Sequence, residues 1–244
     1  MTLRNRYSLL FFILAFAALT STLLSAQSDD YHEKKVREAS SQSVKAGQVF
    51  DAIMKTPDKA IPQELLAHAK AIAVFPQVVK AAFFFGGEGG RGVVSRHTQN
   101  GWSEPVFFRA GGGSVGPQIG ASATDIVLLF MNDEAVAGLM KDKFELGAEA
   151  AVAGGPVGRA ASAGTDALMT AEILSYSRSR GLFAGVNLKG IVIRPEDDLN
   201  FAVYKQSARE LLDPARRETG DTAAGLRSFS KTISHYTTNS ETDQ

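Results

Sequence analysis

The chain has 244 residues, in which 26 lysine and arginine side chains balance 26 aspartate and glutamate side chains. This balance does not support a nucleic-acid-binding protein, which normally carries a strong basic excess. Because the sequence contains no cysteine, disulfides, cysteine nucleophiles and acylation at a cleavage-site cysteine are excluded.

Residues 1–26 have the pattern of a secretory signal peptide. Arg4 and Arg6 form a basic start, the run from 9 to 24 is apolar except for three hydroxyl residues, and the small Ser25-Ala26 precedes a polar stretch. We expect cleavage after this pair and export to a periplasm or envelope compartment, with an uncleaved membrane anchor as the alternative. Cleavage would leave 24 basic and 26 acidic side chains.

The next element is a predicted amphipathic helix over residues 31–55. Apolar residues recur there at helical spacing, the N-terminal half is basic, and Gly47 weakens the helical pattern. A second, shorter helix is predicted over residues 63–70, with Pro62 at its start.

From residue 71 the period changes to that of short strands separated by glycine and proline. Asn100-Gly101 is a hairpin signal, and residues 125–131 are nearly all apolar, so we expect a central strand buried on both faces. The run Asn132-Asp133-Glu134 is predicted to cap a short helix over residues 134–140, with acids in its first turn. The other strands of this region are predicted at 71–75, 81–85, 92–96, 105–109 and 112–122.

The last third of the chain adds further strands and then becomes polar. Predicted elements are strands at 144–153, 158–164 and 171–177, a hairpin over 181–193, a strand-like segment at 197–204 and a helical turn at 207–212. Residues 215–244 are predicted to be a flexible tail with at most one weak helix, at 223–233.

These elements predict an α+β fold. Short turns join the strands, so we expect a curved or barrel-like antiparallel β-sheet of short strands, with an N-terminal helical segment and one or two helices packed at one side. The predicted organisation is a signal peptide at 1–26, one domain at 29–204, and a helical turn followed by a flexible C-terminal tail at 205–244.

Patterns that could carry chemistry lack the context that the chemistry needs. Two glycine runs, at 87–92 and 111–116, match the spacing of a dinucleotide-binding loop, but predicted strands follow them where a helix is required. Ser114 lies in a Gly-x-Ser-x-Gly pattern with no helix after it. The four histidines have no metal-ligand spacing, and Glu145 and Glu149 have no evident acid–base partner. We therefore predict a protein that is not an enzyme and has no metal or cofactor.

Two basic segments remain as candidates for binding lipid phosphate. Arginine beside hydroxyl groups can bind phosphate through charge-assisted hydrogen bonds, and the serine-rich turn at 177–180 contains Arg178 and Arg180. The first helix combines an apolar stripe with basic side chains, a pattern that suits anionic lipid head groups: Lys34, Lys35, Arg37 and Lys45. The alternatives are a solvated turn and an ordinary helix docked on the sheet.

The segment 176–190, Tyr-Ser-Arg-Ser-Arg-Gly-Leu-Phe-Ala-Gly-Val-Asn-Leu-Lys-Gly, resembles the signature of the SYLF family of lipid-binding domains, also named for yeast actin-patch proteins. The resemblance covers about residues 33–204. Further matching motifs follow in the family's order at 69–75, 80–81, 89–94, 101–105, 111–113, 118–120, 125–127, 155–159 and 201–204.

The resemblance implies binding of phosphoinositide or another anionic lipid, with an N-terminal amphipathic segment implicated, and actin binding in the yeast members. In an exported chain neither actin nor phosphoinositide is expected. We therefore predict a non-enzymatic domain that binds anionic phospholipid at a bacterial envelope membrane. The alternative is an envelope structural or protein-interaction module that does not bind lipid directly.

Overall fold

The computed structural model describes residues 30–56, 60–83, 85–114, 120–157, 171–179, 182–185, 188–216 and 224–238. The predicted signal peptide at 1–26 and the predicted strand at 158–164 lie outside the described residues. No helix in the described part of the chain is long and apolar enough to cross a membrane.

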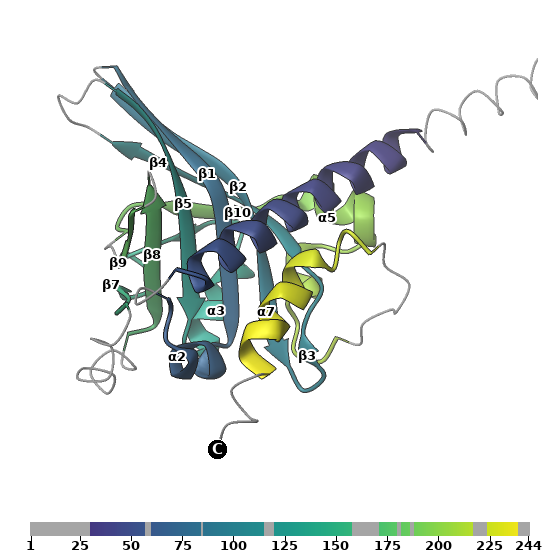
Figure 1. Ribbon diagram of the computed structural model, residues 1–244. Helices are drawn as coiled ribbons and strands as arrows, with labels where there is room; N and C mark the ends of the chain where they lie inside the picture. The colour runs from purple at the N-terminus through teal and green to yellow at the C-terminus, as the bar shows by residue number, and fades with distance from the viewer. Residues whose placement is uncertain are drawn as a thin grey trace, which may run out of the picture.

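A curled sheet of ten strands forms the centre of the molecule (Figure 1). β3 (Gly101–Trp102) pairs with β2, and β9 (Leu182–Gly185) pairs with β8. The main path runs β6 (Phe144–Glu145), β10 (Val192–Pro195), β4 (Val106–Ser114), β2 (Phe85–Thr98), β1 (Ala71–Phe83), β5 (Gly120–Phe130), β8 (Ile173–Ser179) and β7 (Val152–Gly154).

The α+β class and the curved sheet are confirmed, but the sheet is mixed. Of the strand pairs in the described residues, β7–β8 is parallel and the others are antiparallel. The predicted hairpin at Asn100-Gly101 is present, because Thr98 pairs with Gly101 across a two-residue turn, and Gly101 has a φ of 101°, which glycine adopts readily.

Helices cover both faces of the sheet, whereas we expected them at one side. The N-terminal helix (residues 30–54 in the described part of the chain) shares one face with α2 (Gln63–His68), α5 (Asp197–Tyr204) and α7 (Ser228–Thr238). α3 (Asp133–Leu139) and α6 (Ala208–Leu211) lie on the other face. The predicted cap is confirmed, since the Asn132 side chain accepts a hydrogen bond from the Ala135 N–H.

β1 and β5 are buried on both faces, which explains their continuous apolar sequences. In β1, Ala73 and Phe75 pack towards α3 and α6, whereas Ile72 and Val74 pack towards the N-terminal helix. β5 alternates in the same way, so the predicted central strand at 125–131 is confirmed.

Three predicted strand segments are wrong in type, length or pairing. Residues 197–204 form helix α5, whose buried Leu199 and Ala202 are three residues apart, and whose first turn contains two aspartates that favour a helix N-terminus. The segment 181–193 is not a hairpin, because β9 pairs with β8 whereas β10 pairs with β4 and β6. The long strand expected at 144–153 is two short strands, β6 and β7.

The predicted strands at 71–75 and 81–85 are not separate elements. β1 continues through a bulge between Phe75 and Val78 to Phe83, which pairs with Phe85 at the start of β2. At the bulge Gln77 has a φ of 51°, and its backbone N–H donates to an Asp125 carboxylate oxygen. One bulged strand therefore replaces two short ones.

The predicted flexible tail contains a packed helix. In α7, Phe229 and Ile233 are fully buried and lie four residues apart, on the side that faces the N-terminal helix. The Phe229 ring meets Phe50 edge-on, with centroids 6.5 Å apart. The polar composition of this segment hid a narrow apolar stripe that is sufficient for docking.

Small residues let α7 approach the N-terminal helix closely. A Cβ at Gly47 would lie 2.9 Å from Thr232 Oγ1 and 3.5 Å from the Ser228 carbonyl oxygen, so a larger residue there would require at least the Thr232 side chain to move. The buried Ser43 hydroxyl donates to the Leu226 carbonyl and accepts from the Phe229 N–H. Gly47, which weakened the helix prediction, is therefore a contact residue between two helices.

Replacing Phe229 by alanine tests whether the C-terminal helix belongs to the core. We expect Phe229→Ala to lower the free energy of unfolding by about 3–5 kcal/mol, because it removes a fully buried ring between two helices. Urea denaturation followed by circular dichroism measures this change. The exposed neighbour Lys231→Ala should change it by less than about 0.5 kcal/mol; equal effects of the two variants would contradict the packing.

Candidate functional site

The N-terminal helix has a packed side and an exposed side. Its packed side contributes Ala39, Ala46, Phe50 and Ile53, all with no exposed surface, to the core shared with β1, β2 and α7. The apolar stripe that suggested lipid contact is therefore used inside the protein from Ala39 onward. Of the two alternatives for this stripe, docking on the sheet is the one that the structure shows.

The exposed side of the same helix is basic. Lys34, Arg37 and Lys45 are exposed, and their spacing of three and eight residues places them along one side of the helix. Arg37 forms an ion pair with Glu33 one turn earlier. Lys35 differs from these three: it is half-buried, and its Nζ lies 3.2 Å from the Glu38 carboxylate. Three of the four predicted basic residues thus face solvent together.

Arg178 of the serine-rich segment is not brought to this surface as a free cation. Arg178 donates from Nε and Nη2 to Asp125 Oδ2, at 3.0 and 2.9 Å, and the two residues are direct partners across β5 and β8. Arg180 lies outside the described residues. The ion pair gives Arg178 a structural partner, so it makes a weaker phosphate site than the sequence suggested.

The start of the helix is marked by exposed aromatic residues. Its first turns extend past the edge of the sheet and lie beside α5 (Figure 1), where the His32 ring nitrogen Nδ1 is 2.8 Å from the Ala202 carbonyl oxygen. Their neighbours Tyr31 and Phe201 are 56% and 48% exposed, respectively. Aromatic rings beside exposed lysines are typical of surfaces that meet lipid head groups.

An ion network that the sequence analysis did not identify attaches this helix to the sheet. Glu196, at the start of α5, has a side chain that is only 2% exposed. It accepts hydrogen bonds from Arg91 Nε at 3.1 Å and from Arg109 Nη2 at 2.8 Å, and Arg91 Nη2 also contacts it. Arg91 in turn binds Glu38 of the N-terminal helix. The network therefore joins the helix to β2, β4 and α5.

The network also changes the protonation of its members. Burial alone would raise the pKa of Glu38, but the hydrogen bonds from Arg91 and Lys35 outweigh burial and hold this pKa below its usual value. The same contacts raise the pKa of Arg91, chiefly through its hydrogen bond to Glu196. Both residues therefore stay charged over the physiological pH range.

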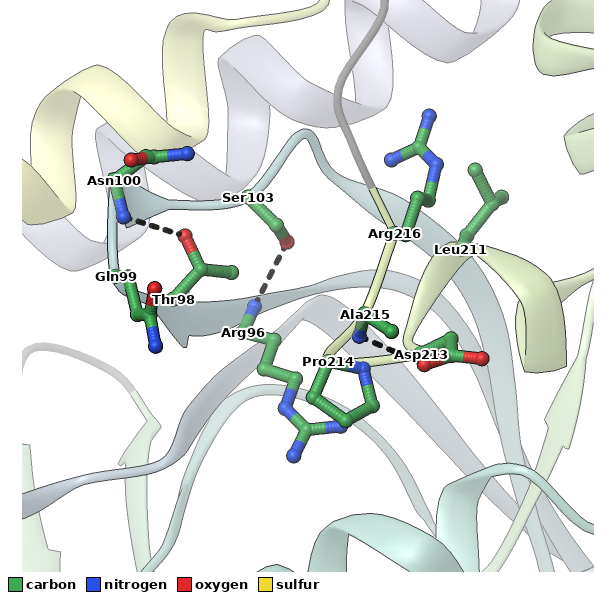
Figure 2. A pocket seen from close by; sticks show the side chains of 10 residues that line it. All are labelled: Arg96, Thr98, Gln99, Asn100, Ser103, Leu211, Asp213, Pro214, Ala215 and Arg216. Carbon is green, nitrogen blue, oxygen red and sulfur yellow. Dashed lines mark hydrogen bonds between the residues drawn. The ribbon is translucent and has the colours of Figure 1, made fainter.

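A polar pocket of about 360 Å³ lies between the β2–β3 hairpin and the segment after α6. Figure 2 shows Thr98, Gln99 and Asn100 on one wall, and the guanidinium groups of Arg96 and Arg216 pointing away from each other. Arg96 donates to the Leu212 carbonyl and to Asp133, and Arg216 donates to Glu104 and Gln206. These charges hold loops in place, and we assign no reaction to this pocket.

The other residues considered for chemistry have structural roles. Glu149 accepts from Lys141 and from the Glu145 N–H, and the Lys141 contact lowers its pKa. The His97 ring stacks on Trp102, with centroids 4.9 Å apart. In the part of the chain that the structure describes, no group of three histidine, aspartate or glutamate side chains is placed to hold a metal ion.

Comparison with known proteins identifies the family. The protein-family model described as "Ysc84: Las17-binding protein actin regulator" matches residues 111–235 of this chain. The chain belongs to this family. The resemblance to the SYLF family is thereby confirmed, and the match extends past residue 204, where we expected the domain to end, into α7.

Relatives of known name are similar over most of the domain. Protein YSC84 of Saccharomyces cerevisiae is 34% identical over 175 residues, which are 70% of this chain and 36% of that protein. The SH3 domain-containing protein PJ696.02 of Schizosaccharomyces pombe is 34% identical over 174 residues, covering 68% and 40%. The human SH3 domain-containing YSC84-like protein 1 is 36% identical over 155 residues, covering 63% and 45%. The chain spans about two fifths of the length of these relatives.

Neutralising Glu38 should reduce the loss of stability that the protein shows as the pH falls from 7 to between 3 and 4. A carboxylate with a lowered folded pKa contributes stability above its unfolded pKa, near 4.5, and loses it as the pH falls through the folded pKa. We expect Glu38→Gln to cost on the order of 1 kcal/mol at pH 7, since the pair is partly exposed. Unfolding in urea at pH 7 and at pH 3 to 4 measures both effects.

Glu33→Gln is the matched control for this prediction, because Glu33 lies on the exposed side of the same helix and pairs only with the exposed Arg37 among the described ion pairs. It should change stability by a few tenths of a kcal/mol. An unchanged acid dependence in Glu38→Gln, or equal losses at both positions, would contradict the role of the network.

Proposed function

We propose that this chain is a non-enzymatic domain that associates with anionic phospholipid at a membrane of the bacterial envelope. Membership of the Ysc84 family supports a regulatory or binding role, since that family is described by what it binds and regulates. The N-terminal pattern at 1–26 supports export. The observation that carries the proposal is the exposed basic side of the N-terminal helix.

The packing of this helix dictates how the membrane would be contacted. Inserting its apolar side into lipid would require Phe50 and Ile53 to leave the core, which would uncover the apolar residues of the sheet beneath them and break the contact with α7. Adsorption of the folded domain avoids this cost. The helix therefore binds with its charged side, lying along the surface without unfolding from the sheet.

The charges on the exposed side are suitable for such adsorption. Lys34, Arg37 and Lys45 extend over about 16 Å of helix, given a rise of 1.5 Å per residue. Each basic residue near an anionic surface contributes about 1 kcal/mol, so the three together give weak, reversible and salt-sensitive binding. The Arg37–Glu33 pair is exposed and contributes little to stability, which leaves Arg37 available to exchange Glu33 for a lipid phosphate. Tyr31 adds an aromatic contact at the head-group level.

Charge reversal on the helix tests the proposal. The triple variant Lys34→Glu, Arg37→Glu, Lys45→Glu should lower the affinity for phosphatidylglycerol-containing vesicles by at least about tenfold, because attraction becomes repulsion. Co-sedimentation over a range of lipid concentrations measures this affinity. The same experiment on neutral phosphatidylcholine vesicles, and at 50 and 300 mM salt, measures the electrostatic part of the binding.

The matched control is the double variant Lys189→Glu, Arg209→Glu, which alters exposed basic residues close to β6 and α3, away from the N-terminal helix. It should retain most of the vesicle binding. Vesicle binding that is the same for anionic and neutral lipid, or equal losses in the two variants, would refute the proposal.

A second candidate function is protein binding. The family description names binding of Las17 and actin regulation, and the segment that this chain shares with Protein YSC84 and its relatives covers most of the domain. If the chain is exported, its binding partner would be an envelope protein and not actin. Saturable co-sedimentation with actin filaments, unaffected by the triple charge reversal, would favour the family's cytoskeletal role over lipid adsorption. A stoichiometric envelope partner recovered by cross-linking in cells would favour the envelope module.

A further inference from the structure

A second pocket, of about 460 Å³, lies where β4, β10 and the beginning of α5 meet. It opens beside the ion network described above, because Arg109 and Glu196 belong to both. Its lining combines small or apolar residues with charged ones; the small or apolar residues are Ala110, Gly111, Val192 and Pro195. The pocket is thus connected through Glu196 and Arg91 to the N-terminal helix at Glu38.

One wall of this pocket carries an arginine pair. Arg109 and Arg194 are direct partners across β4 and β10, and Arg91 is the direct partner of Arg109 across β2 and β4, so three arginines form one row on one face of the sheet. Like charges placed directly opposite each other destabilise a sheet unless other charges compensate them.

Compensation within the row is uneven. Glu196 and Glu38 bind Arg91, and Glu196 also binds Arg109, whose side chain is still 59% exposed. The Arg194 side chain is exposed and forms no ion pair or hydrogen bond with another described residue. The pocket therefore presents one guanidinium group without a described partner, next to a second that has donor groups left over.

Another wall of the pocket is acidic. Asp197 and Asp198 form the first turn of α5, and Asp197 is fixed by accepting a hydrogen bond from the Ala208 N–H at 2.8 Å. Asp198 is exposed at the pocket. A simple anion bound to the arginines would be repelled by these carboxylates, and a simple cation would be repelled by the arginines. A small zwitterion satisfies both walls.

We propose that this pocket binds a phosphoethanolamine group, with the phosphate held by Arg194 and Arg109 and the ammonium directed to Asp198. Guanidinium groups recognise phosphate through paired, charge-assisted hydrogen bonds, and a carboxylate is the natural partner of a primary ammonium. This inference rests on the proposed membrane association, since a phosphatidylethanolamine head group is the source of the ligand. The pocket lies on the same sheet face as the N-terminal helix, because Phe107 and Val93, two residues from Arg109 and Arg91, pack in the core beneath that helix.

Titration of the full mature chain with sn-glycero-3-phosphoethanolamine, followed by NMR, tests the pocket. We expect saturable shifts, a loss of at least fivefold in affinity in Arg194→Gln, and tighter binding than for inorganic phosphate. Asp198→Asn should weaken binding of glycerophosphoethanolamine and leave binding of phosphate equal or stronger, because only the zwitterion uses that carboxylate. Lys189→Gln, an exposed change outside the pocket, is the control and should alter neither affinity.

A second arm identifies the source of the ligand. Adding phosphatidylethanolamine to phosphatidylcholine vesicles should increase co-sedimentation of the wild-type chain but not of Arg194→Gln. Saturable binding of the soluble compound without this increase would overturn the lipid source. Equal affinities for phosphate and glycerophosphoethanolamine, or an unchanged affinity in Arg194→Gln with its thermal unfolding intact, would overturn the site itself.

The two proposals fail separately in these experiments. The triple charge reversal on the N-terminal helix should weaken binding to phosphatidylglycerol vesicles at least about tenfold while leaving the glycerophosphoethanolamine titration unchanged. Arg194→Gln should weaken the titration and leave binding to those vesicles unchanged. A wild-type chain that binds phosphatidylglycerol vesicles but not glycerophosphoethanolamine would overturn the pocket alone, and the opposite result would overturn adsorption through the helix alone.

Discussion

The docking of the N-terminal helix on the curled sheet is the interaction on which the other features depend. Its apolar side, from Ala39 to Ile53, fills the space between the sheet and α7, and Glu38 joins its start to Arg91 and Glu196. Since a helix has only one such apolar side here, that side cannot serve both the core and a membrane. The docking therefore leaves the basic side as the surface for the proposed lipid contact. A helix whose sequence suggested insertion into a membrane is instead part of a folded domain.

Charge on this face of the sheet is arranged in rows set by strand pairing. Asp125 and Arg178 are partners across β5 and β8, and a row of three arginines crosses β2, β4 and β10. In the first pair opposite charges neutralise each other, so the residues stabilise the sheet. In the second row the acids come from outside the sheet, from the N-terminal helix and α5, and compensate some arginines more than others. The difference between a structural ion pair and a candidate ligand site thus lies in where the counter-charges originate.

Local sequence patterns were sufficient for much of the fold. The apolar run of β5, the Asn132 cap of α3 and the hairpin near Gly101 follow from side-chain period, capping chemistry and turn geometry, all of which act within a few residues. The predictions were wrong where contacts with residues distant in the sequence determine the local structure. Residues 197–204 form a helix because Leu199 and Ala202 pack on the sheet. The segment that forms α7 packs against Phe50 and Ser43, which precede Phe229 by 179 and 186 residues. The acidic first turn of α5 and the apolar stripe of α7 are present in the sequence, but they do not show what these helices pack against.

The ordered motifs that surround Tyr176 identify the family without a structure, and Lys34, Arg37 and Lys45 give the first helix its basic character. The folded chain was needed to show which side of that helix is exposed and that Arg178 is bound by Asp125. It was also needed to show that Arg91, Arg109 and Arg194 form one row, because strand register sets such neighbours. Composition and spacing describe each strand alone, whereas the meeting of charges from β2, β4, β10 and α5 depends on how strands far apart in the chain are aligned and on which helices cover them.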